Sequence, residues 1–116
     1  MHSLSPMVVE NIVEKVEYAM ISKVAHHANI CAELNKLYER KNSDYGDSFS
    51  QSFKEEGLVM ARIRLGDKFN RFKSLSKSGA RQVQDESIRD TLIDLANYAI
   101  MTVMELEDDA NGDDLK

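Results

Sequence analysis

The chain has 116 residues, 42% of them hydrophobic and 30% charged, which suits one small globular domain with its own core. Its formal net charge of −5 argues against binding to nucleic acid through a basic surface, so no direct nucleic-acid binding is expected. One cysteine excludes an intramolecular disulfide, and no apolar run reaches the ~18 residues that a membrane span requires. These features predict a cytoplasmic protein without a membrane partner.

The first predicted helix begins at Ser5 and Pro6, because serine is a favoured N-cap residue and proline fits the first helical position. Apolar residues at helical spacing follow and continue to Lys41. The first of them are Val8, Val9, Ile12, Val13, Val16, Ala19, Met20 and Val24. One helix of about 35 residues fits this pattern, and so do two helices that meet near residues 25–29. We favour a break there.

Residues 41–50, KNSDYGDSFS, are the clearest predicted loop, because asparagine, serine, aspartate and glycine favour turns. Two interpretations of this loop stay open. In the first, it is a turn in which Asp47 or Ser48 caps a short helix over residues 49–56. In the second, it grips a ligand, with Tyr45 offering an aromatic face and a hydroxyl group.

A further helix is predicted from Leu58 to Ser76, after the break at Gly57. A basic stripe runs along it, formed by Arg64, Lys68 and Arg71 at helical spacing. Gly66 lies in the middle of this helix, where glycine costs about 1 kcal/mol relative to alanine. Its presence there suggests that another backbone or a ligand approaches closely.

The last predicted helix covers residues 85–107 and is apolar almost all round from residue 91 to 104, which is typical of a helix buried on several sides. Four polar side chains fall within a band about 80° wide on this helix: Glu86, Asp90, Asp94 and Asn97. A row of carboxylates on a buried helix is costly unless positive charge or hydrogen-bond donors meet it. Residues 108–116 are predicted to be an acidic, frayed tail.

Together these elements predict an all-α fold, an antiparallel bundle of four long helices or of three long helices and a short one. A single domain would span residues 1–116, with 1–5 and 108–116 flexible. The apolar surfaces of the first and last long helices exceed what one small bundle covers. We therefore expect a homo-oligomer, most simply a dimer.

The acidic row and the basic stripe allow two interpretations. They form an interhelix network that neutralises itself and fixes the register of the helices, or they form a site for Mg²⁺ and phosphate. In the second case, carboxylates hold the metal, and lysine and arginine hold the remaining phosphate charge. Sequence signatures of the common nucleotide-binding loops, zinc sites and nucleophile elbows are not found in the chain.

A family resemblance rests on two segments and on Lys68 and Arg71 between them. The segments read KNSDYG at residues 41–46 and DTLIDLANY at residues 90–98. They resemble the nucleotide-modification-associated domain, type one, of phage and bacterial proteins, over about residues 30–107. That family is similar to the MazG and dimeric dUTPase group of all-α nucleoside triphosphate pyrophosphatases. The resemblance implies a MazG-like, oligomeric bundle that handles nucleotides with Mg²⁺, in the host cytoplasm if a phage encodes it.

The resemblance, together with the acidic row, the basic stripe and the loop, implies roles for individual residues. Asp90 and Asp94 would be catalytic and, with Glu86, would hold Mg²⁺ or position water. Nucleotide binding would fall to Lys41, Asn42, Asp44, Tyr45, Lys68, Arg71 and Asn97. Among these, Lys68 and Arg71 would hold phosphates, and Tyr45 would stack on the base or sugar.

The chain departs from the pyrophosphatase pattern in both acidic motifs. Its later acids are four residues apart, and Glu33 is followed by Lys36 where a second acid is expected. Three hypotheses therefore stay open. They are a Mg²⁺-dependent nucleoside triphosphate pyrophosphohydrolase, a non-catalytic module that binds or sequesters a nucleotide or other phosphorylated small molecule, and a structural helical oligomer that binds a protein partner.

Overall fold

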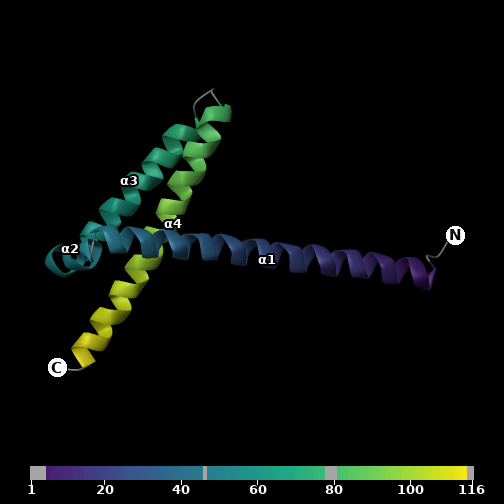
Figure 1. Cartoon of the computed structure of the whole chain (residues 1–116), viewed down its shortest axis with the longest axis horizontal. Helices are drawn as coiled ribbons and strands as arrows, with labels where there is room; N and C mark the ends of the chain where they lie inside the picture. Colours follow the sequence, from purple (N-terminus) through teal and green to yellow (C-terminus); the bar gives the residue numbers. More distant parts are fainter. Residues whose placement is uncertain (1–4, 46, 78–80, 115–116) are drawn as a thin grey trace. The chain divides into compact units, whose positions relative to one another are not determined.

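The computed structural model describes residues 5–45, 47–77 and 81–114, and within these ranges it leaves the side chains of 21, 43–45, 81–86 and 111–114 undescribed. The described chain contains four helices and no strand, which confirms the all-α prediction. The helices are α1 (Pro6–Tyr45), α2 (Ser48–Glu56), α3 (Leu58–Ser76) and α4 (Arg81–Asp114) (Figure 1). None of the helices in these ranges is long and apolar enough to cross a membrane. The cytoplasmic location stays a prediction.

The start of α1 confirms the predicted cap. The backbone N–H of Val8 donates a hydrogen bond to Oγ of Ser5 over 3.3 Å, and the N–H of Val9 donates to the carbonyl oxygen of Ser5 over 3.1 Å. Pro6 is the first helical residue, where its missing N–H costs nothing. The sequence alone therefore determines where this helix begins.

The predicted break near residues 25–29 is wrong, because α1 is one continuous helix from Pro6 to Tyr45. The prediction of a loop over residues 41–50 is wrong for its first half, since residues 41–45 belong to the same helix. Asparagine, serine and aspartate cost only a few tenths of a kcal/mol each inside a helix that is already formed. The helix ends at Tyr45, directly before Gly46, a residue type common after helix ends. Gly46 itself lies outside the described residues.

The last helix is longer than predicted at both ends, since α4 runs from Arg81 to Asp114. The frayed tail predicted from residue 108 is therefore wrong as far as Asp114. Ala110 is a strong helix former, and Gly112 costs about 1 kcal/mol, which a long helix tolerates. Residues 115 and 116 lie outside the described ranges.

By its contacts the chain divides into two units, Met1–Lys36 and Leu37–Lys116, and each is described by itself. The prediction of one domain stays a prediction. In the first unit, the predicted apolar face of α1 is exposed, with Val16 54% and Met20 63% accessible. The homo-oligomer also stays a prediction.

Light scattering on a size-exclusion column tests this prediction. The wild type should have at least twice the monomer mass, and Val16→Glu, which places a charge on the apolar face, should have the monomer mass. Glu14→Gln, on the opposite face of α1, is the control and should keep the mass of the wild type.

The second unit contains α2, α3, α4 and the last turns of α1. Figure 1 shows α3 and α4 side by side and running in opposite directions, as an antiparallel bundle requires. Ala61 on α3 is completely buried, and Thr91 and Thr102 on α4 are nearly so. Each threonine hydroxyl donates to the carbonyl oxygen one turn before it, over 2.7 Å. Their burial therefore leaves no hydroxyl without a partner.

The junction of α2 and α3 lies at Gly57, as predicted. Gly57 has a φ of 77°, which favours glycine, and its N–H donates to the carbonyl oxygen of Phe53 over 2.7 Å. Helix α3 has the predicted bounds. The expected close approach of another backbone at Gly66 is wrong, because a Cβ atom built there meets nothing within 4 Å.

Replacing Gly66 by alanine should therefore stabilise the protein. Alanine is favoured over glycine by about 1 kcal/mol inside a helix, and the added methyl group has room. Urea unfolding should show this gain in the free energy of unfolding. The matched control is Gly57→Ala, which should destabilise because of its positive φ. A loss of stability in Gly66→Ala would contradict the prediction.

Candidate functional site

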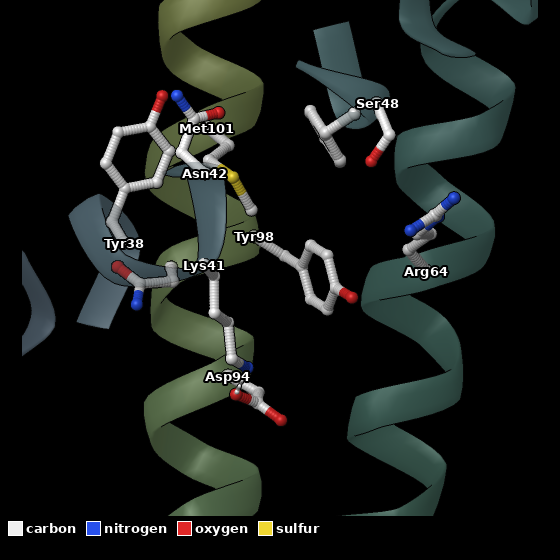
Figure 2. Close-up of a pocket in the computed structure, with 10 residues that line it drawn as sticks. Tyr38, Lys41, Asn42, Ser48, Arg64, Asp94, Tyr98 and Met101 are labelled. Carbon is white, nitrogen blue, oxygen red and sulfur yellow. Dashed lines mark hydrogen bonds and ion pairs between the residues drawn. The ribbon is translucent and has the colours of Figure 1, made fainter. Parts of the chain in front are cut away.

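A cavity of about 400 Å³ lies within the second unit, between the end of α1, the start of α2 and the middle of α3 and α4 (Figure 2). This volume is in the range of small-molecule sites. Its lining residues are Tyr38, Lys41, Asn42, Ser48, Phe49, Arg64, Asp94, Asn97, Tyr98 and Met101.

Helical periodicity explains why these residues meet. On α4, Asn97, Tyr98 and Met101 lie three, four and seven positions after Asp94, so the four side chains project from one side of the helix. On α1, Tyr38, Lys41 and Asn42 have the same spacing, which they owe to the continuation of α1 through residues 41–45. A loop at this point would not hold Lys41 in that register.

The charged part of the site centres on Asp94. Lys41 Nζ donates a hydrogen bond to Oδ1 of Asp94 over 3.2 Å, and Lys68 Nζ donates to Oδ2 over 3.1 Å. The Asp94 side chain is 26% exposed, against 29% for Lys68 and 52% for Lys41. Burial alone would raise the pKa of the Asp94 carboxyl, but hydrogen bonds from Lys68 and Lys41 and their positive charges outweigh it and lower the pKa below its ordinary value of 3.8. Asp94 is therefore ionised at neutral pH.

The two ion pairs of Asp94 should make the free energy of unfolding depend on pH. A carboxyl group with a lowered pKa in the folded state stabilises the fold above its ordinary pKa of 3.8, and this contribution is lost as the pH falls below that value. Asp94→Asn should lower the free energy of unfolding by about 1 kcal/mol at pH 7 and by less at pH 3. Urea unfolding at both pH values measures the difference. An equal loss at the two values would show that the ion pairs do not stabilise the fold.

The aromatic part of the site lies beside the charged part. The ring centroids of Phe49 and Tyr98 are 5.9 Å apart, with 32° between the ring planes. The guanidinium carbon of Arg64 lies 6.0 Å from each centroid, at the outer limit of a cation–π contact. Figure 2 shows Arg64 and Tyr98 on facing helices, α3 and α4, with Ser48 of α2 nearby. The site thus joins aromatic faces to cationic groups within one cavity.

The structure brings several of the sequence-predicted residues together. Lys41, Asn42, Asp94 and Asn97 line the cavity, and Lys68 contacts it through Asp94. Asp90 and Arg71 are exposed and are not among the lining residues. The side chains of Asp44, Tyr45 and Glu86 lie outside the described part of the structure, so their predicted roles stay predictions.

Sequence reasoning placed Arg64 in the basic stripe but did not assign five other lining residues to the site: Tyr38, Ser48, Phe49, Tyr98 and Met101. Helical spacing from a predicted residue would have found three of them, since Tyr38 lies three residues before Lys41, and Tyr98 and Met101 lie four and seven residues after Asp94. Phe49 and Ser48 carry no such signal. They reach the site because α2 packs against α3 and α4.

The described residues show no cluster of the side chains that commonly bind metal ions. They contain no group of three or more histidine, cysteine, aspartate or glutamate side chains placed to hold an ion. Both oxygens of Asp94 accept hydrogen bonds from lysines, and Asp90, one turn before it, is exposed. The Asp94–Lys68 pair fits the interhelix network interpretation, because it joins α4 to α3. The magnesium site at Glu86, Asp90 and Asp94 stays a prediction.

The family described as nucleotide modification associated domain 1 matches residues 41–106, which is more than half of the chain. The matched region contains every lining residue of the cavity except Tyr38. No curated protein and no solved structure matches the chain.

Proposed function

Because the chain belongs to the nucleotide modification associated domain 1 family, we propose that it binds a nucleotide in the cavity between α1, α2, α3 and α4. One observation carries this proposal: an aromatic pair with an arginine lies next to two lysines that share a carboxylate. A nucleotide has the complementary parts, since a planar base stacks on aromatic rings and a phosphate meets cationic side chains.

In this proposal the two parts of the ligand occupy the two parts of the site. The base lies against Phe49 and Tyr98, where burial of apolar ring surface favours stacking. The phosphate lies towards Lys41 and Lys68. Arg64, whose guanidinium carbon is 6.0 Å from each ring centroid, binds the base face or the phosphate. Amide groups of Asn42 and Asn97 and the hydroxyl of Ser48 line the cavity as hydrogen-bonding groups for the base edge or the sugar.

Hydrolysis of a nucleoside triphosphate to a monophosphate and pyrophosphate is the second candidate function. Its support is Asp94, an ionised carboxylate that lines the cavity at the position where the sequence predicts a catalytic residue. Asp90 and Glu86 belong to the same predicted acidic row. Mg²⁺ is a proposal within this candidate, and the described residues supply only Asp94 at the cavity.

Differential scanning fluorimetry tests the proposal directly. A ligand that binds only the folded state raises the melting temperature by an amount that grows with its concentration. We expect at least one member of a panel of ribo- and deoxyribonucleotides to do so, and calorimetric titration should then give its Kd. Release of pyrophosphate in the presence of Mg²⁺ would favour the hydrolytic candidate. If no nucleotide shifts the melting temperature with or without Mg²⁺, nucleotide binding is refuted and a structural helical oligomer remains.

A further inference from the structure

The charge of the site selects among nucleotides. Three cationic side chains lie at or next to the cavity, Lys41, Arg64 and Lys68, and Asp94 is the carboxylate between two of them. Counted over these four described side chains, the site therefore carries a net charge of +2. A phosphate monoester carries about 1.5 to 2 negative charges at pH 7, so one terminal phosphate neutralises the site.

We propose that the cavity takes a nucleoside monophosphate without a metal ion, and that its phosphate competes with the Asp94 carboxylate for Lys41 and Lys68. This inference rests on the proposed function and names the ligand class for the same cavity. Lys41 and Lys68 approach one carboxylate from α1 and α3, each within 3.2 Å of a different oxygen. The Asp94 carboxylate thus occupies the position between the two ammonium groups that the phosphate of the ligand would take.

Larger and smaller ligands fit this charge less well. An uncharged nucleoside would leave the net charge of +2 on these described side chains unneutralised. A triphosphate brings two further phosphoryl groups, whose charge proteins commonly offset with Mg²⁺ held by one or two carboxylates. Among the described residues, Asp94 is the one carboxylate in the cavity lining, and the two lysines already take both of its oxygens.

The ion pairs of Asp94 set the affinity of this site. Lys41 is half exposed, so its contact with Asp94 is the weaker of the two and the easier for a ligand to replace. A phosphate that enters must also overcome electrostatic repulsion by the ionised carboxylate, because like charges repel more strongly in the reduced dielectric near a protein surface than in water. Removing the negative charge of Asp94 should therefore strengthen phosphate binding, the reverse of what loss of a metal ligand does.

Calorimetric titration of the full chain tests this. The probes are the common ribo- and deoxyribonucleoside monophosphates, their nucleosides and triphosphates, and inorganic phosphate, each in EDTA and in Mg²⁺. We expect one monophosphate to bind in EDTA at least tenfold more tightly than its nucleoside and at least as tightly as its triphosphate in Mg²⁺. Tighter binding of the triphosphate in Mg²⁺ would overturn this inference and leave nucleotide binding intact. Absence of binding by every nucleotide would instead refute the proposed function itself.

Two variants complete the test. Asp94→Asn should bind the monophosphate at least threefold more tightly than the wild type, and Lys41→Gln, at a half-exposed position, should bind it at least threefold more weakly with no change for the nucleoside. Arg62→Gln, an exposed position on the same helix as Lys68, is the control. Weaker monophosphate binding by folded Asp94→Asn would overturn the competition between the carboxylate and the phosphate. Unchanged binding by Lys41→Gln would overturn the placement of the phosphate.

Discussion

Replacing Tyr98 by alanine should weaken nucleotide binding by about 1–3 kcal/mol, which is roughly a factor of 5 to 150 in Kd. Tyr98 lines the cavity from α4, and its ring lies 5.9 Å from that of Phe49 and 6.0 Å from the guanidinium carbon of Arg64. Truncation removes one of the two rings on which we propose that the base stacks, and one of the two rings next to Arg64. Calorimetric titration with the tightest-binding nucleotide measures the change.

Two further variants separate stacking from folding in this experiment. Tyr98→Phe keeps the ring and should keep the affinity within about a factor of three, because it loses only the hydroxyl group. Ile100→Ala removes an exposed apolar side chain from α4 outside the cavity and should leave binding unchanged. If Tyr98→Ala stays folded and binds as tightly as the wild type, the base does not lie against this ring pair.

Replacing Lys68 by glutamine should weaken binding of a phosphate-bearing nucleotide by about 1.5–3 kcal/mol, roughly 10- to 150-fold, as for loss of a hydrogen bond to a charged group. Two effects act in the same direction. The variant loses one ammonium group, and Asp94 then keeps Lys41 as its sole lysine partner among the described contacts, which makes Lys41 less available to the ligand. The loss should shrink at high salt, because screening weakens partly exposed charge interactions.

The same variant distinguishes the site from a structural network. Lys68 also joins α3 to α4 through Asp94, so a small loss of stability is expected in either case. The decisive comparison is between a nucleotide and its nucleoside. A loss confined to the phosphate-bearing ligand supports the site, whereas lower stability with unchanged affinity for both would leave Lys68 as an interhelix contact only. Arg62→Gln, exposed on α3, again serves as the control.

Local sequence rules placed the helices well where a single residue type decides the outcome. Ser5 and Pro6 mark the start of α1, and Gly57 marks the α2–α3 junction, as predicted. The same rules failed at residues 41–45, where asparagine, serine and aspartate predict a loop but the chain is helical. Propensities there differ by only tenths of a kcal/mol per residue, which a long helix and its tertiary contacts outweigh.

The candidate site was predicted in part. Spacing alone placed Glu86, Asp90, Asp94 and Asn97 on one side of a helix, and Arg64, Lys68 and Arg71 on one side of another. Which acid meets which base depends on how the two helices are rotated and shifted against each other. A change of one turn moves a side chain about 5.4 Å along the axis, which is enough to place Lys68 on Asp94 while Arg71 and Asp90 stay exposed.

By itself, the sequence determined that the chain is helical and which polar residues share a helix face, because both follow from periodicity. It also determined two helix boundaries through capping and glycine, and the family resemblance through two short motifs. Only the tertiary structure decided that Asp94 is the acid held by two lysines and that Phe49, Tyr98 and Arg64 lie beside it. Those contacts join residues up to 53 positions apart, and they form through the packing of buried positions such as Ala61 and Thr91, which no local pattern specifies.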